Sequence, residues 1–227
     1  MKIVEEKAVN QIVMNTEVVK LNQEVIMHKL AVYMFLQKFY SGELLKINKA
    51  TWRQLSHLIK REISFFREEK IEKGIQIMSE LNTRDILELE FDFNRLFIGP
   101  NRLEAAPYES VYRSTDRALM QAETMAVRRF YEKAGLVLNK KNTDPDDHLS
   151  LELEFVCHLL NETVEDEVHY SLYEDYLKEH LFQWVEDHCE LVREKTTNTV
   201  IIGISYMLQG LLEEERKQMN IPRRLKK

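Results

Sequence analysis

The stretch DDHLSLELEFVCHLL, Asp146 to Leu160, decides the fold class of this chain. Asp146 or Asp147 is suited to cap a helix, and apolar residues then recur at intervals of three and four, which is the period of an α-helix. A helix that is apolar on two sides is buried on two sides, so we expect this one to lie centrally in a helical bundle. One apolar stripe comprises Leu149, Leu153, Val156 and Leu160, and the other comprises Leu151, Phe155 and Leu159.

The same helical period continues on both sides of this stretch. Thr51 is the expected N-cap of one helix, and Gly135 suits the position that follows the last turn of another. The chain has no convincing run of strict apolar–polar alternation and no Asn-Gly or Asp-Gly hairpin signal. We therefore predict an all-α protein in which residues 1–227 form a single helical bundle of about eight to ten helices, with a proline-containing interior loop at 98–110. The expected helices cover approximately residues 18–40, 51–66, 68–81, 84–97, 116–134, 146–160, 169–194 and 197–219.

Composition supports this fold class. Only 6 glycines and 4 prolines occur in 227 residues, while 44% of the residues are hydrophobic and 31% are charged. A disordered chain is poorer in apolar residues, and a collagen-like or turn-rich chain is richer in glycine and proline. The formal net charge of −6 argues against a nucleic-acid partner, which favours a basic excess, and it suits a basic peptide partner.

The sequence also predicts a cytoplasmic protein. Cys157 and Cys189 are too few for a disulfide framework, so we interpret them as free thiols in a reducing compartment. Residues 1–7 are charged and lack the apolar core of a signal peptide. The most apolar stretch, Val200–Leu212, contains polar residues and is shorter than the ~20 residues that a membrane-spanning helix needs.

The usual catalytic and metal-binding patterns are absent from the sequence. The 7 histidines form no Glu-x-x-His or His-Glu-x-x-His pattern, and there is no Cys-x-x-Cys. Glu154 and His158 share a helix face, and we interpret them as a hydrogen-bonded surface pair. There is also no Gly-x-Ser-x-Gly motif and no glycine-rich phosphate loop. We therefore predict no catalytic residue, no metal and no cofactor.

Three segments stand apart from this helical pattern. The segment Asp144–His148 carries three carboxylates where a helix cap needs one, so it is either a cap or a site that attracts a guanidinium group. The middle loop, residues 98–110, is unusually apolar for a non-helical segment, and it is a core plug, a groove for a peptide helix, or both. Arg223 and Arg224 form a twin-arginine pair, which we interpret as part of a solvated basic tail.

The segment FNRLFIGPNRLEAAPYESVY, Phe93 to Tyr112, closely resembles the signature of the TorD/DmsD family of molybdoenzyme maturation chaperones; the NarJ-type chaperones are more distant. Three further segments agree with that family in order and spacing. They are RALMQAETMAVRRFYEKAGL, PDDHLSLELEF and HLFQW, which begin at Arg117, Pro145 and His180. Four motifs in the same order are specific, whereas any one of them alone is a weak signal.

The resemblance covers residues 91–184 well and residues 1–81 only as a helix pattern. It implies a cytoplasmic, non-enzymatic chaperone that binds the twin-arginine leader peptide and the apo-form of a molybdoenzyme, assists cofactor insertion and holds back export until maturation. It also implies a transient association with the membrane export machinery, and either a monomer or a helix-swapped dimer. The alternatives are a GTP-binding or GTP-hydrolysing helical protein and an oligomeric scaffold.

Several positions match family residues that are implicated in leader binding. Asp147 and His148 match an Asp-His pair, and Phe93 takes the place of a Trp in an apolar patch that includes Leu96 and Phe97. The leader-binding set that the resemblance implies is Phe93, Leu96, Phe97, Pro107, Tyr108, Pro145, Asp147 and His148.

The resemblance and the helical spacing together predict how these side chains lie. We expect Phe93 and Tyr108 to be partly exposed at the rim of an apolar groove, and Phe97 to belong to the core. Ala106 departs from a double proline of the family, and Gln121 replaces a glycine that is implicated in binding in some members. The net acidic charge would aid the encounter with a basic leader.

Overall fold

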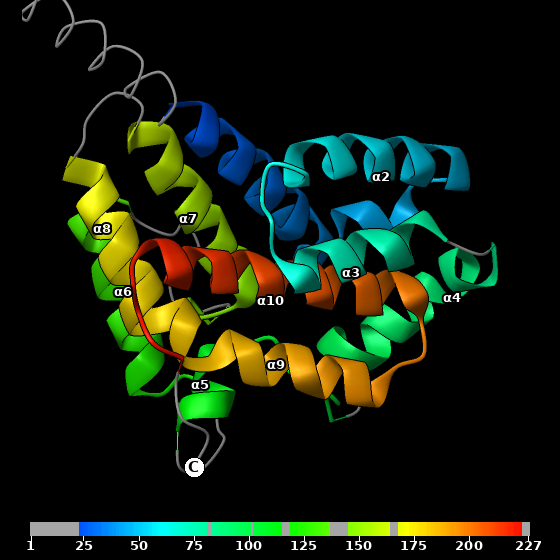
Figure 1. The fold of residues 1–227 in the computed structure, drawn as a ribbon. Coiled ribbons are helices and arrows are strands. Elements are labelled where there is room, and N and C mark those ends of the chain that lie inside the picture. Colours follow the sequence, from blue (N-terminus) through cyan, green and yellow to red (C-terminus); the bar gives the residue numbers. More distant parts are fainter. Residues whose placement is uncertain are drawn as a thin grey trace, which may run out of the picture.

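The computed structural model describes residues 23–80, 83–100, 102–114, 119–136, 145–163 and 168–223. These residues form helices and the connections between them (Figure 1), so the prediction of an all-α protein is confirmed. When directly continuous segments are counted together, the described ranges hold nine helices besides the short 3₁₀ helix η1, within the eight to ten predicted. The segments are residues 23–40, η1 (Glu43–Lys46), α2 (Lys49–Ile63), α3 (Glu69–Ser79), α4 (Thr83–Phe93), η2 (Asn94–Ile98), α5 (Glu109–Arg113), α6 (Ala122–Lys133), α7 (Leu149–Thr163), α8 (Val168–Tyr176), η3 (Leu177–Leu181), α9 (Phe182–Lys195) and α10 (Thr199–Gln218).

Helix α10 lies in the middle of the molecule, with α3 on one side and α9 on the other (Figure 1). It is the longest of the named helices, and buried residues occur along its whole length rather than on one stripe. A helix that is covered on all sides organises the elements around it. Its buried apolar residues are Val200, Ile201, Ile204, Met207, Leu208, Leu211 and Leu212.

Helix α7 is buried on two sides, as its two apolar stripes predict. Of the seven stripe residues only Leu151 is half-buried, and the other six are buried. The Phe155 ring of α7 lies 4.7 Å from the rings of Tyr131 on α6 and Tyr176 on α8. The central position that the sequence favours for α7 belongs instead to α10.

Glycines allow α3 and α10 to cross at very short distance. A Cβ atom added at Gly74 of α3 would lie 2.7 Å from the carbonyl oxygen of Gly203 on α10. A Cβ at Gly203 would lie 2.7 Å from Cγ of Met78, and one at Gly210 would lie 2.7 Å from the backbone nitrogen of Ile71. The two backbones are therefore in contact at positions where only hydrogen fits.

A buried ion pair attaches the helix of residues 23–40 to α10. Lys29 Nζ donates a hydrogen bond of 2.7 Å to Glu215 Oε2, and the two side chains are 2% and 1% exposed. Lys29 also lies 5.8 Å from the ring centroid of Tyr173. Loss of either partner would leave an uncompensated charge in the core, which is strongly destabilising.

Local predictions had different outcomes. The N-cap of α2 is Asn48, whose Oδ1 accepts the N–H of Thr51 at 3.0 Å, so the prediction that Thr51 is the cap is wrong. Asn48 lies three residues before Thr51, and its side-chain oxygen accepts a backbone N–H of the first turn that has no partner within the helix. Cys157 and Cys189 are free thiols, half-buried and buried, as expected. In the part of the chain that the structure describes, no helix combines the length and apolar character that crossing a membrane requires.

We predict that Gly74→Ala destabilises the protein by about 1–3 kcal/mol, because the added methyl group would overlap the α10 backbone. Helix propensity alone would favour alanine by about 1 kcal/mol, so the two effects have opposite signs. The urea midpoint measures the change, and Ser79→Ala on the exposed face of α3 is the matched control. A midpoint for Gly74→Ala at or above that of the wild type would contradict the close crossing.

Candidate functional site

Two sequence motifs that are far apart in the chain meet at a junction formed by Pro107, Tyr108, Asp147 and His148, here called the loop junction. Tyr108 and His148 form an isolated antiparallel bridge, in which Glu109 N donates to Asp147 O at 3.1 Å and Leu149 N donates to Pro107 O at 2.8 Å. The Tyr108 and His148 rings stand edge to face, 4.9 Å apart, and both residues are half-buried. The partial exposure predicted for Tyr108 is confirmed.

Asp147 joins the helices around this junction from a fully buried position. Its Oδ2 accepts the N–H of Ser110 at 2.8 Å, and its Oδ1 accepts the hydroxyl of Thr124 at 2.8 Å. It therefore caps the first turn of α5, a helix distant in sequence, rather than the helix that follows it. His148 caps α7 instead, because its Nδ1 accepts the N–H of Ser150 at 3.1 Å. The prediction that Asp146 or Asp147 caps this helix is wrong.

Asp146 is also satisfied within the protein. The guanidinium of Arg128 donates to both oxygens of its carboxylate, and Tyr131 Oη donates to its backbone oxygen at 2.9 Å. Pro145 is half-buried, and its carbonyl oxygen accepts the N–H of His148 at 3.3 Å. Of the three carboxylates predicted to cap a helix or attract a guanidinium group, Asp146 and Asp147 thus bind donors of the protein itself, and Asp144 lies outside the described residues.

Phe93, Leu96 and Phe97 do not form an exposed patch. Phe93 is 1% exposed, its ring lies 5.4 Å from that of Phe39 and 4.9 Å from that of Phe97, and Leu96 is fully buried. The prediction that Phe93 reaches the rim is wrong, whereas Phe97 belongs to the core as predicted. Residues four apart share a helix face, and here that whole face points into the core.

The exposed apolar side chains of this segment are Leu87, Phe91 and Ile98, here called the α4 ridge. They are 78%, 71% and 64% exposed. Leu87 and Phe91 are four residues apart and share one face of α4, and Ile98 is the last residue of η2, the π-helical segment that continues α4. Large apolar side chains that gather on a surface mark an interaction site more often than single ones do. The sequence signal is the alternation LELEFDF from Leu87, in which apolar residues are interleaved with carboxylates.

The ridge has acidic surroundings. Helix α4 carries four acidic residues and one arginine. Glu88 and Glu90 are exposed beside the ridge residues, and Arg84 is paired with Glu88 at 3.0 Å. Arg95, in η2, is paired with Asp92 and Glu104. This face therefore combines exposed apolar area with an excess of negative charge.

A chain of buried rings connects the segment below the ridge to the loop junction. His188 of α9 lies 5.8 Å from the Phe97 ring, and its Nδ1 is 3.0 Å from the hydroxyl of Tyr112, four residues after Tyr108. Burial, aided by the charge of His148, lowers the pKa of His188 to about 3. His188 is therefore neutral at physiological pH and acts as a hydrogen-bonding spacer.

Beneath the junction lies a buried polar cluster of Glu109, Glu152, His180 and Tyr176. His180 Nδ1 and Glu109 Oε2 are 2.8 Å apart, and Tyr176 Oη donates to Glu152 Oε2 at 3.1 Å. The guanidinium of Arg113 also binds Glu109. Burial raises the pKa of Glu152 well above its usual value, and the charges of Glu109 and Asp147 raise it further.

This cluster is the one group in the described ranges whose spacing could suit a metal ion, through Glu109, Glu152 and His180. A metal ion would have to displace the His180–Glu109 hydrogen bond and approach the positive charge of Arg113. Hydrogen bonds and the Arg113 guanidinium already balance the Glu109 carboxylate, whereas Glu152 Oε1 and His180 Nε2 are buried without a hydrogen-bond partner among the described residues. The arrangement therefore suits a structural network that fixes α5 against α7 and η3. Sequence reasoning named the His180 motif but gave His180 no role.

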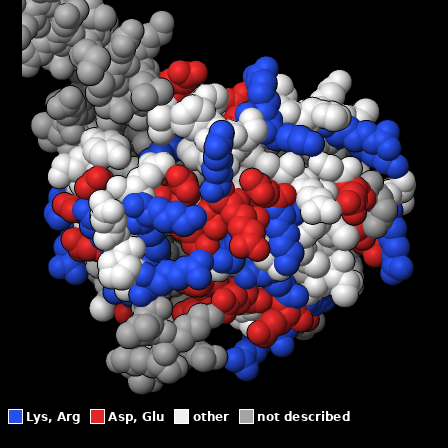
Figure 2. All heavy atoms as spheres, in the orientation of Figure 1, with Lys and Arg blue, Asp and Glu red and all other residues white. Residues whose placement is uncertain are grey.

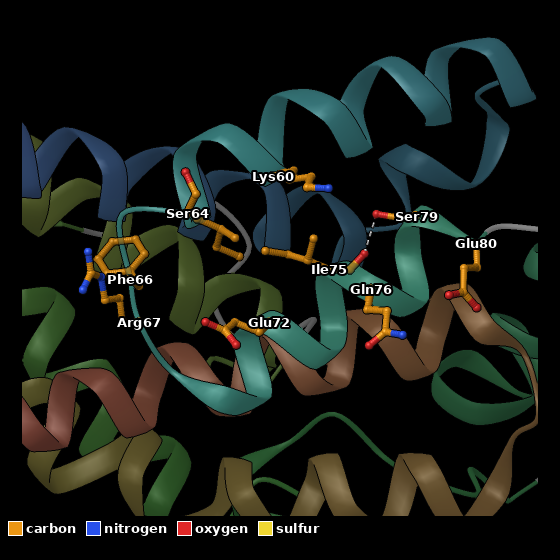
Figure 3. A pocket seen from close by; sticks show the side chains of 10 residues that line it. Lys60, Ser64, Phe66, Arg67, Glu72, Ile75, Gln76, Ser79 and Glu80 are labelled. Carbon is orange, nitrogen blue, oxygen red and sulfur yellow. Dashed lines mark hydrogen bonds between the residues drawn. The ribbon is translucent and has the colours of Figure 1, made fainter.

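An open hollow of about 500 Å³ lies between α2 and α3 (Figure 3). Its floor is apolar, and its rim carries charges of both signs, Lys60 and Arg67 as well as Glu72 and Glu80. None of its described lining residues is a glycine, so it lacks a flexible backbone loop of the kind that cradles phosphates. The hollow therefore offers no specific support for the GTP alternative. Its other lining residues are Ile63, Ser64, Phe66, Ile75, Gln76 and Ser79.

The sequence profile of the family described as "Nitrate reductase delta subunit" matches residues 49–190. The chain is also similar to curated chaperones. It is 26% identical over 203 residues to chaperone protein TorD of Aliivibrio salmonicida, covering 82% of this chain and 92% of that protein. It is 27% identical over 171 residues to TorD of Vibrio atlanticus, covering 68% and 77%. It is 28% identical over 133 residues to the probable Tat proofreading chaperone DmsD of Haemophilus influenzae, covering 59% and 61%.

We predict that Asp147→Asn destabilises the protein by about 1–3 kcal/mol. Both carboxylate oxygens of Asp147 accept hydrogen bonds from buried donors, the N–H of Ser110 and the hydroxyl of Thr124. In asparagine an NH₂ group replaces one of these oxygens, and because it is itself a donor it cannot accept that hydrogen bond. Chemical denaturation measures the loss, and Asp187→Asn at an exposed position of α9 is the control. An unchanged midpoint for Asp147→Asn would show that the junction does not depend on this carboxylate.

A second prediction concerns pH. The pKa of Glu152 is raised in the folded state, so its protonated form contributes stability that is present at low pH and is lost as the pH rises through the folded-state pKa. Glu152→Gln imitates the protonated carboxyl group. We expect it to raise the urea midpoint relative to the wild type more at pH 8 than at pH 5. The exposed Glu154→Gln should give no such pH-dependent difference, and equal behaviour of the two variants would contradict the prediction.

Proposed function

Because the chain belongs to the nitrate reductase delta subunit family and resembles the TorD and DmsD chaperones, we propose that it is a maturation chaperone. Its ligands in this proposal are the twin-arginine leader and the apo-form of a molybdenum-cofactor oxidoreductase. In this role it assists cofactor insertion and holds back export until the client is mature. It acts in the cytoplasm as a binding protein rather than as a catalyst, with a transient association with the export machinery.

The α4 ridge is the observation that carries this proposal. A twin-arginine leader presents two arginines followed by an apolar stretch, and its receptor needs carboxylates beside an apolar surface. Leu87, Phe91 and Ile98 supply that surface, and Glu88 and Glu90 supply exposed negative charge next to it. Burying one such apolar side chain contributes about 1.5–3 kcal/mol, so three of them provide a substantial part of a peptide's affinity.

The residues that the family resemblance implicates have two roles in this proposal. Phe93, Leu96 and Phe97 support the ridge helix from the core side, because they are buried directly beneath it. Tyr108 and His148 are half-buried and offer ring edges to a ligand, and Asp147 holds them in place through the bonds of the junction. These supporting bonds allow the binding surface to keep its shape without the client.

We predict that the double variant Leu87→Ser/Phe91→Ser weakens binding of a twin-arginine leader peptide by about tenfold or more, with an unchanged urea midpoint. Both side chains are exposed, so their removal costs little folding energy. Fluorescence anisotropy with a labelled peptide measures the affinity, and Phe65→Ser, at an exposed position in the turn that follows α2, is the control.

The same titration at two salt concentrations separates the two parts of the surface. The carboxylate contribution is screened by salt and the apolar contribution is not, so affinity should fall without vanishing. An affinity that is independent of salt would exclude the acidic contribution. A double variant that binds as tightly as Phe65→Ser would exclude the ridge.

A further inference from the structure

Three carboxylates converge where α3 begins and where α9 and α10 run beside each other. Glu68 precedes α3, Glu186 lies on α9 and Glu213 lies on α10; together they are called the carboxylate cradle. Figure 2 shows acidic and basic side chains interleaved across this face of the molecule. The side chains of Glu68 and Glu213 are each only 6% exposed, so they are set into the surface rather than spread over it.

The cradle is fixed by the packing around it. Glu68 Oε2 accepts the N–H groups of Lys70 at 2.7 Å and Ile71 at 3.2 Å, which caps α3. Lys70 Nζ donates to both oxygens of Glu213, at 2.6 and 2.8 Å. A Cβ at Gly210 would lie 2.6 Å from Glu68 Oε2, so only glycine lets this carboxylate approach α10.

A guanidinium group of the protein itself already occupies the cradle. After α10 the chain turns back through a hydrogen bond of 2.9 Å from Ile221 N to Arg216 O, and Arg223 Nη2 lies 2.5 Å from Glu213 Oε2. Partial burial alone would lower the pKa of Arg223, but the hydrogen bond and charge of Glu213 and the charges of Glu186 and Glu68 raise it. Arg223 is thus exposed, as expected for a solvated tail, but it is also paired with a carboxylate of α10, which the sequence did not indicate.

The contact has the properties of an exchangeable one. The side chain of Arg223 is 58% exposed, while the carboxylate that it binds is almost buried. Exposed ion pairs contribute little to stability, so a competing guanidinium can displace Arg223 at small cost. In the sequence Arg223 is followed by Arg224 and the apolar Leu225, the same order of residue types that a twin-arginine leader presents.

We propose that the carboxylate cradle binds consecutive arginines of the client's leader, and that Arg223 occupies it in the free protein as an intramolecular competitor. This inference rests on the proposed function and adds a regulatory contact to it. The Arg223 contact lowers the affinity for leaders, so that weakly matched peptides are rejected. A leader that also buries its apolar stretch gains enough free energy to displace it.

The test compares the binding of a labelled leader peptide to the wild-type chain, Arg223→Gln and Arg61→Gln. Arg61 is an exposed arginine of α2 that is paired with Glu62 at 2.8 Å and belongs to neither the α4 ridge nor the carboxylate cradle, so Arg61→Gln is a control for loss of the charge. We expect Arg223→Gln to bind about two- to fivefold more tightly than the control, the range set by an exposed ion pair. Equal affinities of Arg223→Gln and Arg61→Gln would overturn the proposal.

A second arm removes the acceptors. Glu213→Gln should abolish the gain produced by Arg223→Gln, and Glu186→Gln, at a half-buried position, serves if Glu213→Gln does not fold. A gain that persists in the folded double variant would overturn the cradle as the site.

A diarginine peptide without an apolar stretch tests the cradle separately from the ridge. The affinity of the Arg223→Gln variant for this diarginine peptide should be higher than its affinity for a dilysine peptide, because the planar guanidinium fork matches a carboxylate. If this peptide binds and the full leader shows no dependence on the ridge, the proposed leader surface fails while the cradle stands. If the full leader binds, but the diarginine peptide does not bind and Arg223→Gln leaves the affinity for the leader unchanged, the cradle fails while the proposed function stands.

Discussion

The direct backbone contact between α3 and α10 is the constraint on which the rest of this structure depends. Gly74, Gly203 and Gly210 leave no side chain between the two helices at their crossing. Close packing of this kind fixes distance and angle at once, since a Cβ atom added at any of the three glycines would lie within 2.7 Å of atoms of the other helix, with backbone atoms among them at Gly74 and Gly210. It also sets Glu68, which caps α3, against Glu213 of α10. The same contact thus positions both the core and the acidic face above it.

A second principle of the fold is that helix ends receive their hydrogen-bond partners from distant segments. Asp147 satisfies the first turn of α5 and anchors Thr124 of α6, and His180 of η3 binds Glu109 on α5. The helix α5 has only five residues and would not be stable alone. Its order comes from these buried bonds. Residues that the family resemblance associates with ligand binding are therefore also residues that hold the two halves of the chain together.

The exposed surface combines apolar area with negative charge at the α4 ridge, and at the separate carboxylate cradle the chain's own Arg223 is paired with Glu213. The periodic pattern of α4 explains the first. Its apolar residues occupy two faces, and the core takes the face of Leu89 and Phe93 and leaves that of Leu87 and Phe91 in solvent. A helix that is apolar on two sides but buried on one retains a surface for another molecule.

The sequence by itself determined the helical class, the approximate extent of most helices, the absence of a sheet signal, and the motifs that identify the family, because periodicity, caps and motif spacing are local properties of the chain. It also indicated that the motifs around Tyr108 and His148 belong to one region. Only the tertiary structure decided which apolar face of α4 is covered, that Asp147 caps a helix other than its own, that α10 rather than α7 is central, and that Arg223 is seated against Glu213. Each of these depends on which segments become neighbours after folding, and burial and hydrogen bonding are set by those neighbours rather than by the residues adjacent in sequence.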